Sequence, residues 1–378
     1  MLDFEYSEEE VQLSNNIPNI INEKKRMRED VNLFNKKQKT ITKDNINDIQ
    51  SPLLENRIKN KRIVIAVGGN ALLRRGETFS YENQVKAAMN AARIIKYFSQ
   101  TNQVILTHGN GPQIGALALE RKTTPFDILG AETQGQIGYI FSQAFETIGQ
   151  TAVSIITQVL VDKTDIAFND PTKYIGKIYT KDESDALIKE NNWNMKQDGK
   201  YWRRVIPSPQ PLQIQQIEAV RILLESQQCK PPMKLLPILC GGGGIPIRYD
   251  ESGCIKGVEA VIDKDNCSAL LANEIDADIF IILTDGGGIY EYYGTEEQRE
   301  MIEVTPEYLI KTKSGVNFPG SMGPKINAVV NFVQRSNKEN VYAIIGDLLD
   351  AENVLSNISG TKIKKNVKDE VIWRDNKK

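Results

Sequence analysis

The stretch from Ile63 to Leu73 places five consecutive apolar residues directly before two glycines and an asparagine. An uninterrupted run of mostly β-branched residues is typical of a strand that is buried on both faces, as in a parallel sheet covered by helices. At the carboxyl end of such a strand, Gly68 and Gly69 leave the backbone open to a small anionic ligand. The loop has neither the Gly-Lys-Ser/Thr of a Walker A motif nor the Gly-x-Gly-x-x-Gly spacing.

The same order of strand, glycine-rich loop and helix recurs along the chain. Strands are predicted over 104–107, 152–161, 235–240, 279–284 and 341–345, and a hairpin turn over 250–253. Helices are predicted over 81–98, 113–121, 132–148, 213–225, 263–274 and 348–358, with another running from the glycine-rich segment 320–325 to 334. This alternation predicts an α/β fold with a mostly parallel sheet covered on both faces.

Composition excludes several classes of function. The net charge of −2 over 378 residues gives no reason to expect nucleic acid or a membrane surface as partner. No apolar run approaches the ~20 residues that span a bilayer. The four cysteines form no Cys-x-x-Cys pair, and the single histidine is distant in sequence, so we expect no zinc site and a reduced, cytoplasmic protein.

Two segments depart from the alternating pattern. Residues 1–60 contain no glycine, tryptophan or cysteine and many asparagines and charges, which predicts a disordered or partly helical extension. The extension could be a dispensable tail or could bind a partner. Residues 162–211 are polar and hold four prolines and two of the three tryptophans. A segment this long inside a domain is usually functional, so we expect a lid or a small excursion domain.

Two lysines stand beside glycine-rich loops, Lys264 in Val-Ile-Asp-Lys-Asp and Lys325 in Gly-Ser-Met-Gly-Pro-Lys. Phosphoryl transfer needs this combination, since backbone amides and fixed cations hold and neutralise the phosphates. Asp263 could orient a lysine or could only cap the following helix. His108 invites a role as general base, but shaping its loop by a hydrogen bond is the more economical role.

Taken together and in this order, the loops resemble the carbamate kinases of the amino-acid kinase superfamily. The matching stretches are Gly68–Leu72, His108–Gln113, Ala131–Gly135, Asp170–Lys173, Gly241–Pro246, Ala260–Asp265 and Gly320–Lys325. The resemblance implies an open, mainly parallel sheet between helix layers, a protruding lid subdomain and a homodimer. The kinase domain would span 61–366, with the lid at 162–211, the carbamate side mainly in 61–240, the nucleotide side mainly in 241–366, and a charged tail at 367–378.

The reaction that the resemblance implies is reversible phosphoryl transfer between ATP and carbamate, which gives ADP and carbamoyl phosphate. It would run toward ATP synthesis in arginine catabolism. Mg²⁺ would arrive with the nucleotide, and no metal site made of protein side chains is expected.

Residue roles carried over from the resemblance fall into three groups. Lys173 on the lid, Lys264 and Lys325 would stabilise the transferring phosphoryl group, and Asp263 would position the lysines. Phosphate and substrate would be held by Gly68, Gly69, Asn70, Gly109, Asn110, Gly111, Gly241, Gly242, Gly243 and Gly244. The nucleotide would meet Asp285, Tyr290, Met322 and Lys325.

Two positions decide between related readings. Carboxylate kinases of the superfamily typically place a lysine on the first strand, two residues before the Gly-Gly pair. This chain has Ala66 there, which points to carbamate. After strand 279–284 the family usually continues Asp-Val-x-x-Val-Tyr, whereas this chain has three glycines at 286–288. Two alternatives to a carbamate kinase remain. One is another amino-acid kinase that acts on a carboxylate, and the other is a nucleotide-binding sensor with impaired catalysis.

Overall fold

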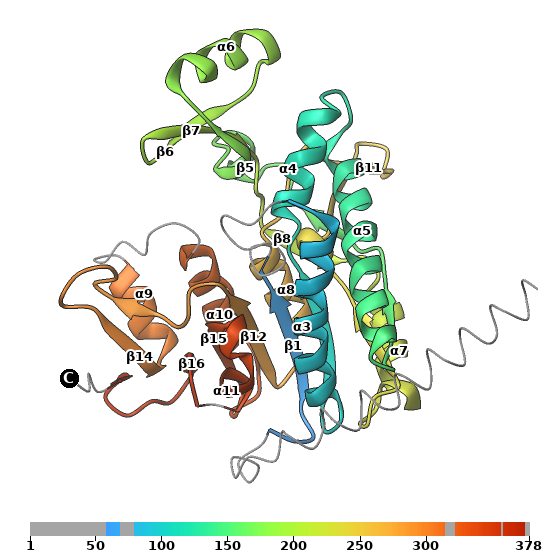
Figure 1. Ribbon diagram of the computed structural model, residues 1–378, viewed down its shortest axis with the longest axis vertical. Coiled ribbons are helices and arrows are strands. Elements are labelled where there is room, and N and C mark those ends of the chain that lie inside the picture. Colours follow the sequence, from blue (N-terminus) through green and yellow to red (C-terminus); the bar gives the residue numbers. More distant parts are fainter. Residues whose placement is uncertain (1–57, 69–78, 314–321, 357, 375–378) are drawn as a thin grey trace, which may run out of the picture. The chain divides into compact units, whose positions relative to one another are not determined.

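A computed structural model describes residues 58–68, 79–313, 322–356 and 358–374 (Figure 1). Its main element is a ten-stranded sheet in the order β13 (Tyr290–Glu291), β14 (Arg299–Val304), β16 (Thr361–Lys364), β15 (Tyr342–Asp347), β12 (Ile279–Thr284), β1 (Arg62–Val67), β2 (Gln103–His108), β9 (Leu235–Ile238) and β3 (Thr151–Ser154), with β17 (Val371–Trp373) paired to β14. From β15 through β3 every neighbouring pair is parallel. The expectation of an open, mainly parallel sheet is confirmed.

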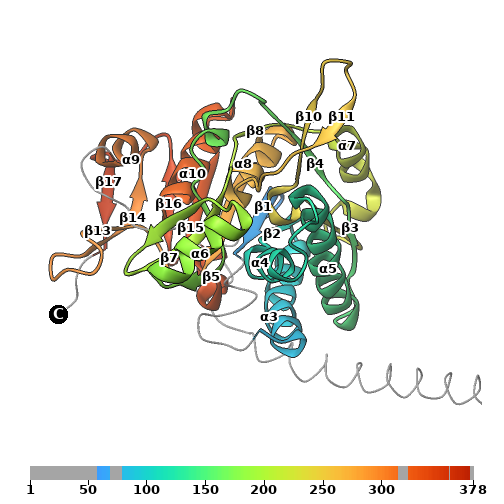
Figure 2. The ribbon, with the colours of Figure 1, turned by 90° about the horizontal axis from the view of Figure 1, so that it is seen from above.

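Strand β1 lies in the middle of this sheet and is buried on both faces, as its sequence predicts. Ile63, Ile65 and Val67 pack with α3 (Tyr81–Ser99) and α5 (Phe126–Thr147). Val64 and Ala66 pack on the opposite face with α8 (Lys264–Glu274) and α10 (Met322–Arg335). Figure 2 shows these two helix layers on either side of β1. Burying a branched side chain of this size contributes about 1.5–3 kcal/mol, so β1 anchors both layers.

Two smaller sheets complete the fold. One has the order β11 (Ile255–Gly257), β10 (Ile245–Tyr249), β4 (Gln158–Val161) and β8 (Pro211–Ile214). The other has the order β5 (Lys173–Tyr179), β7 (Tyr201–Ile206) and β6 (Met195–Asp198), and it carries helix α6 (Lys181–Asn191). This last unit projects from the body in Figure 1 and falls within the segment where a lid is expected. Residues 173–206 are called the lid below.

The predicted strand over 152–161 is wrong in one respect, because the chain forms two strands that belong to different sheets. β3 ends at Ser154 and β4 begins at Gln158. Between them the Thr157 amide donates to the Gln134 side chain (2.6 Å), and the Thr157 hydroxyl accepts from the Cys240 amide (3.1 Å). Contacts with residues far along the chain therefore turn the backbone at a point where local sequence shows no break.

The predicted helix over 213–225 begins late. Residues up to Ile214 form strand β8 against β4, and α7 spans only Ile217–Glu225. Pairing of β8 with β4 thus outweighs the helical pattern of residues 213–214. Helix α5 instead begins earlier than expected, at Phe126, whose amide donates to the Glu259 carboxylate at 3.1 Å. Within the described residues, the other α-helices are α4 (Gly111–Glu120), α9 (Pro306–Lys313) and α11 (Ala351–Leu355).

At the two ends of the chain the structure adds detail to the expected extension and tail. Residues 1–57 lie outside the described part, but Ile58 is buried in the core and its carbonyl accepts from the Asn102 side chain. Strand β17 lies within the segment expected to be a charged tail and pairs antiparallel with β14. Its Trp373 ring packs under the guanidinium of Arg299 at 4.1 Å.

Candidate active site

The carboxyl ends of β1 and β2 lie next to each other, because the two strands are parallel neighbours. The Gly68 amide donates to the Leu283 carbonyl and the Gly109 amide to the Val67 carbonyl, both at 3.0 Å. Asn110 precedes α4, and its side-chain amide donates to the Thr133 hydroxyl at 2.9 Å. The predicted site residues Gly69 and Asn70 lie outside the described residues. Gly68, Gly109, Asn110 and Gly111, which are predicted to bind phosphate or substrate, therefore lie together at the carboxyl ends of β1 and β2.

The four-glycine run packs against the carboxyl end of β2 so closely that side chains do not fit. A Cβ on Gly241 would lie 2.5 Å from the His108 ring, and one on Gly242 would lie 2.2 Å from the Asn110 amide. A Cβ on Gly243 would lie 2.2 Å from the Ile262 carbonyl oxygen. Gly242, Gly243 and Gly244 also have positive φ angles of 66°, 96° and 80°. The glycines thus join the β2 loop to the segment that carries Asp263 and Lys264.

Gln134 on α5 holds the glycine run in place through a hydrogen bond to Gly241. It is not one of the predicted site residues. Its side-chain nitrogen donates to the Gly241 carbonyl at 2.8 Å, and its oxygen accepts from the Thr157 amide at 2.6 Å. Both contacts span long sequence separations, so local pattern gives no signal for them. Gln134 is buried, which makes these hydrogen bonds its means of satisfying both polar atoms.

Asp263 makes two kinds of contact, one with the start of a helix and one with a lysine. One carboxylate oxygen caps α8 by accepting from the amides of Asp265 (3.0 Å) and Asn266 (3.3 Å). The other oxygen accepts from Lys173 Nζ on the lid at 2.6 Å. The structure therefore brings the lid lysine and the helix N-terminus to one carboxylate.

Asp265 organises the other two lysines and was not predicted. It is 2% exposed, forms an ion pair with Lys264, and lies 3.4 Å from Lys325 Nζ. The Asp-Lys-Asp order of 263–265 is a local signal for this role, because carboxylates on both sides of a lysine stabilise its ammonium charge. Lysines from the lid, from α8 and from α10 thus converge on two adjacent carboxylates. We call Lys173, Asp263, Lys264, Asp265 and Lys325 the lysine cluster.

Electrostatics of the lysine cluster follow from burial and from opposite charges. Burial alone would raise the pKa of Asp263, but Lys173, followed by Lys264 and Lys325, holds that pKa well below its usual range. Burial also opposes the charge of Lys173, yet the Asp263 carboxylate outweighs it and the pKa of Lys173 is raised. For Lys264, burial lowers the pKa, and Lys325 adds to this while Asp265 opposes it. Lys173 and Asp263 are therefore charged at neutral pH.

His108 is fully buried beneath the glycine run. Burial lowers its pKa to about 4, so the imidazole is neutral at physiological pH. Its Nδ1 lies 3.2 Å from the Gly109 carbonyl, and its ring lies 5.9 Å from that of Phe141. These contacts agree with a residue that shapes its loop, as expected.

The three glycines that follow β12 have a structural reason of their own. A Cβ on Gly288 would lie 2.7 Å from the Thr361 hydroxyl oxygen, and that same oxygen accepts from the Ile289 amide at 2.7 Å. Asp285 is exposed at the end of β12, Tyr290 is half-buried on β13, and Met322 begins α10 and packs on the core. The β12 loop is thus built on strand β16.

The part of the chain that the structure describes contains no group of three or more His, Cys, Asp or Glu side chains able to hold a metal ion. The oxygens of Asp263 and Asp265 already meet lysines and backbone amides. Mg²⁺ usually keeps several waters and binds through one or two carboxylates together with phosphates.

Comparison with known proteins gives a consistent result. Residues 61–346 match the model of the amino acid kinase family. Carbamate kinase of Haemophilus influenzae is 45% identical over 314 residues, which cover 80% of this chain and 97% of that protein. Carbamate kinase of Pyrococcus furiosus is 41% identical over 321 residues, covering 80% and 99%. The structure of carbamate kinase from Giardia lamblia bound to AMP-PNP superposes with a TM-score of 0.70 at 36% identity, over 81% of this chain and 99% of that one.

Proposed function

The chain belongs to the amino acid kinase family and, within it, to the carbamate kinases, and from that premise we propose that the lysine cluster is its catalytic centre. The enzyme is an ATP-dependent phosphotransferase: the γ-phosphoryl group of ATP passes to a carbamate oxygen, leaving ADP and carbamoyl phosphate. One observation carries the assignment. Lysines from three separate elements meet at Asp263 and Asp265.

The chemistry of the proposed centre is charge stabilisation. Phosphoryl transfer spreads negative charge over the transferring oxygens, and catalysis consists mostly of positioning and neutralisation. Lys264 and Lys325 would neutralise that charge from the floor, and Lys173 would do so from the lid. The two carboxylates hold the ammonium groups close together, which three free lysines would resist.

The glycine loops would hold the anions. Gly68, Gly69, Asn70, Gly109, Asn110 and Gly111 would bind substrate on one side, Gly241–Gly244 would form the floor, and Asp285, Tyr290 and Met322 would border the nucleotide. A carbamate oxygen is already anionic, so no base has to remove a proton from the nucleophile. His108 is fully buried and its pKa is lowered to about 4, which would make it a weak base, so its environment is consistent with this proposal.

Ala66 favours carbamate over the larger carboxylates of related kinases. Its side chain is fully buried in β1 among the helices of one layer, where a lysine would lack both room and solvent. The cation that those kinases place on this strand is supplied here by Lys173. An amino-acid kinase acting on another carboxylate is therefore the weaker candidate.

Formation of ATP from ADP and carbamoyl phosphate tests this function. We expect Mg²⁺-dependent ATP production, abolished by EDTA and restored by added Mg²⁺, because the ion neutralises phosphate charge that the lysines alone do not cover. Chromatographic separation of ATP from ADP, which does not itself need Mg²⁺, measures the product, and acetylglutamyl phosphate as the competing phosphoryl donor separates the two candidates. ATP from acetylglutamyl phosphate alone would overturn the assignment, and nucleotide binding with no turnover would favour a sensor. We propose that the reaction runs toward ATP in arginine catabolism.

We also propose a homodimer. β3 is the terminal strand of the main sheet. Nearby, Ile156 is 47% exposed, and on α5, which packs on β3, Tyr139 is 56% exposed. An uncovered edge strand beside exposed apolar side chains is typical of a surface that pairs with another chain. Sedimentation velocity should give twice the 42.5 kDa of one chain, and a single species at the monomer mass would contradict the proposal.

We propose a reducing, cytoplasmic location. All four cysteines are free, and three of them are buried in the body. Secreted domains more often join such thiols in disulfides. Across the described ranges, no helix is both long and apolar enough to cross a membrane.

A further inference from the structure

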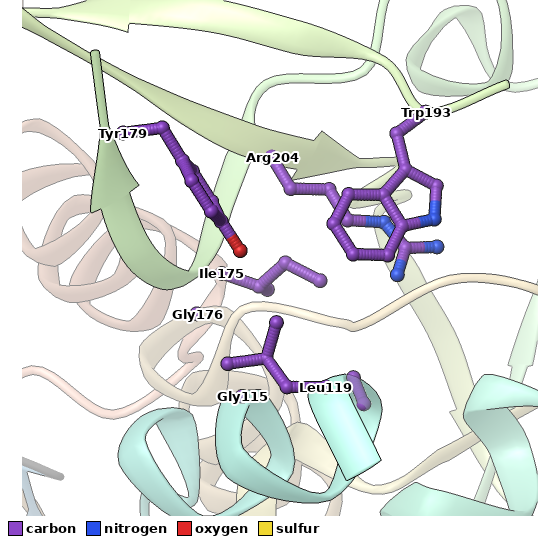
Figure 3. Close-up of a pocket in the computed structure, with 8 residues that line it drawn as sticks. Gly115, Leu119, Ile175, Gly176, Tyr179, Trp193 and Arg204 are labelled. Atoms are coloured by element: carbon purple, nitrogen blue, oxygen red, sulfur yellow. The ribbon is translucent and has the colours of Figure 1, made fainter. Parts of the chain in front are cut away.

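The lid meets the body along a small, mainly apolar seam. On the body side are Gly115, Ala118 and Leu119 of α4, and on the lid side are Ile175, Gly176, Tyr179, Trp193 and Arg204. Figure 3 shows Arg204 beside the Trp193 indole, with the Tyr179 ring on the other side of the pocket. Ile175 and Ile206 of the lid also pack in one cluster with Ile114 and Phe126 of the body.

Two glycines allow the backbones to touch in this seam. A Cβ on Gly115 would lie 2.8 Å from the Gly176 nitrogen and 3.0 Å from its Cα, and Gly176 has a φ angle of 67°. Because both near atoms are backbone, no side-chain rotation could relieve the overlap. An alanine at 115 would have to push β5, and Lys173 with it, away from the body.

Arg204 on β7 bridges the lid and the body through aromatic faces. Its guanidinium lies 4.3 Å from the centroid of Trp193 in the lid and 5.0 Å from that of Phe126 at the start of α5. Burial lowers the pKa of Arg204, and the nearby Glu259 carboxylate opposes that effect. Glu259 accepts from the Phe126 amide and stands four residues before Asp263. The contact thus reaches the segment that carries the carboxylates.

Strand pairing transmits this attachment to the lid lysine. In the β5–β7 ladder, Ile175 pairs with Arg204 and Lys173 pairs with Ile206. Whatever fixes Arg204 against Phe126 therefore fixes the register and height of Lys173, whose Nζ lies 2.6 Å from Asp263. We infer that Arg204, seated on Phe126 and Trp193 and supported by the Gly115–Gly176 contact, is a positioning residue for Lys173. This inference rests on the proposed catalytic role of Lys173.

A double-mutant cycle tests the inference. Arg204→Ala should lower kcat for ATP formation by about 10-fold, because Lys173 then loses its fixed position. Arg204→Lys keeps a cation over the rings and should restore at least half of the activity. In a Lys173→Ala background, Arg204→Ala should lower kcat no further, because the lysine that Arg204 positions is already absent.

Matched controls separate positioning from general damage to the lid. Lys181→Ala removes a cation that lies 4.3 Å from the Trp202 ring, a contact made wholly inside the lid, and should change kcat less than twofold. Gly115→Ala should lower kcat as Arg204→Ala does, while Gly130→Ala, where a Cβ meets nothing within 4 Å, should leave it unchanged. The Gly115 variant tests the seam even where Arg204→Ala fails to fold.

The outcomes distinguish the inference from the role on which it rests. An equal loss from Arg204→Ala with and without Lys173 would overturn the inference, as would full activity in both Arg204→Ala and Gly115→Ala. Full activity in Lys173→Ala would instead overturn the catalytic role of that lysine. A tenfold loss that vanishes in the Lys173→Ala background supports both.

Discussion

Lys264→Ala is expected to lower kcat for ATP formation by roughly 10²–10³-fold, the loss typical of removing one preorganised group that stabilises transition-state charge. Lys264 lies at the first turn of α8 in an ion pair with buried Asp265. The ion pair holds the Lys264 ammonium group in position before substrate arrives, so no free energy is spent on orienting it during the reaction. Initial rates with saturating ADP and carbamoyl phosphate measure the effect.

The control for this variant is Lys230→Ala, which removes a solvent-accessible lysine paired with Glu225. Surface pairs of this kind contribute at most about 1 kcal/mol, and the activity should stay within twofold of the parent. Circular dichroism confirms that the Lys264 variant is folded. A loss of only a few-fold in a folded Lys264→Ala enzyme would exclude the proposed role.

Gly243→Ala is expected to destabilise the protein by about 3 kcal/mol or more, and to abolish activity where the protein still folds. The φ angle of 96° alone costs a side chain about 1–2 kcal/mol. The new Cβ would also lie 2.2 Å from the Ile262 carbonyl oxygen, which can move only if the segment leading to Asp263 moves. Urea unfolding followed by tryptophan fluorescence gives the change in the free energy of unfolding.

Gly253→Ala is the matched control for Gly243→Ala. Gly253 also has a positive φ angle, 79°, but a Cβ there meets nothing within 4 Å. It should show the backbone cost of about 1–2 kcal/mol alone, with full activity. Equal destabilisation by the two substitutions would mean that the close approach to Ile262 has no energetic weight.

The buried strands could be predicted from sequence because their signal is local. The apolar runs of β1, β2 and β12 are each long enough to show burial on both faces, and the structure confirms all three. The split of 152–161 into β3 and β4 could not be predicted, since the turn depends on Gln134 and Cys240, which are distant in sequence. Strand β8 could not be predicted either, because it forms by pairing with β4, which is distant in sequence.

The candidate site divides in the same way. Asp263 and Lys264 adjoin each other at a helix start, so their local context reveals them. Lys173 was placed by family resemblance, and its contact with Asp263 spans 90 residues of sequence. Asp265 has a local signal too, because it follows Lys264 in the Asp-Lys-Asp order of 263–265. Arg204 has no local signal, because its aromatic neighbour on the body comes from α5.

The ion pair between Lys173 and Asp263 also bears on how tightly substrates are held before reaction. Lys173 already has an anionic neighbour in Asp263. If it binds substrate as proposed, an arriving phosphate would replace that carboxylate as the counter-ion of the ammonium group, and only the difference between the two attractions would add to affinity. Attraction that is cancelled in this way would add little to ground-state affinity, whereas charge that shifts toward Lys173 in the transition state would still be stabilised. Catalysis depends on that differential, since equal stabilisation of both states would deepen binding without raising kcat. The Asp263 carboxylate would thus lower the affinity of Lys173 for bound anions and so speed the release of product.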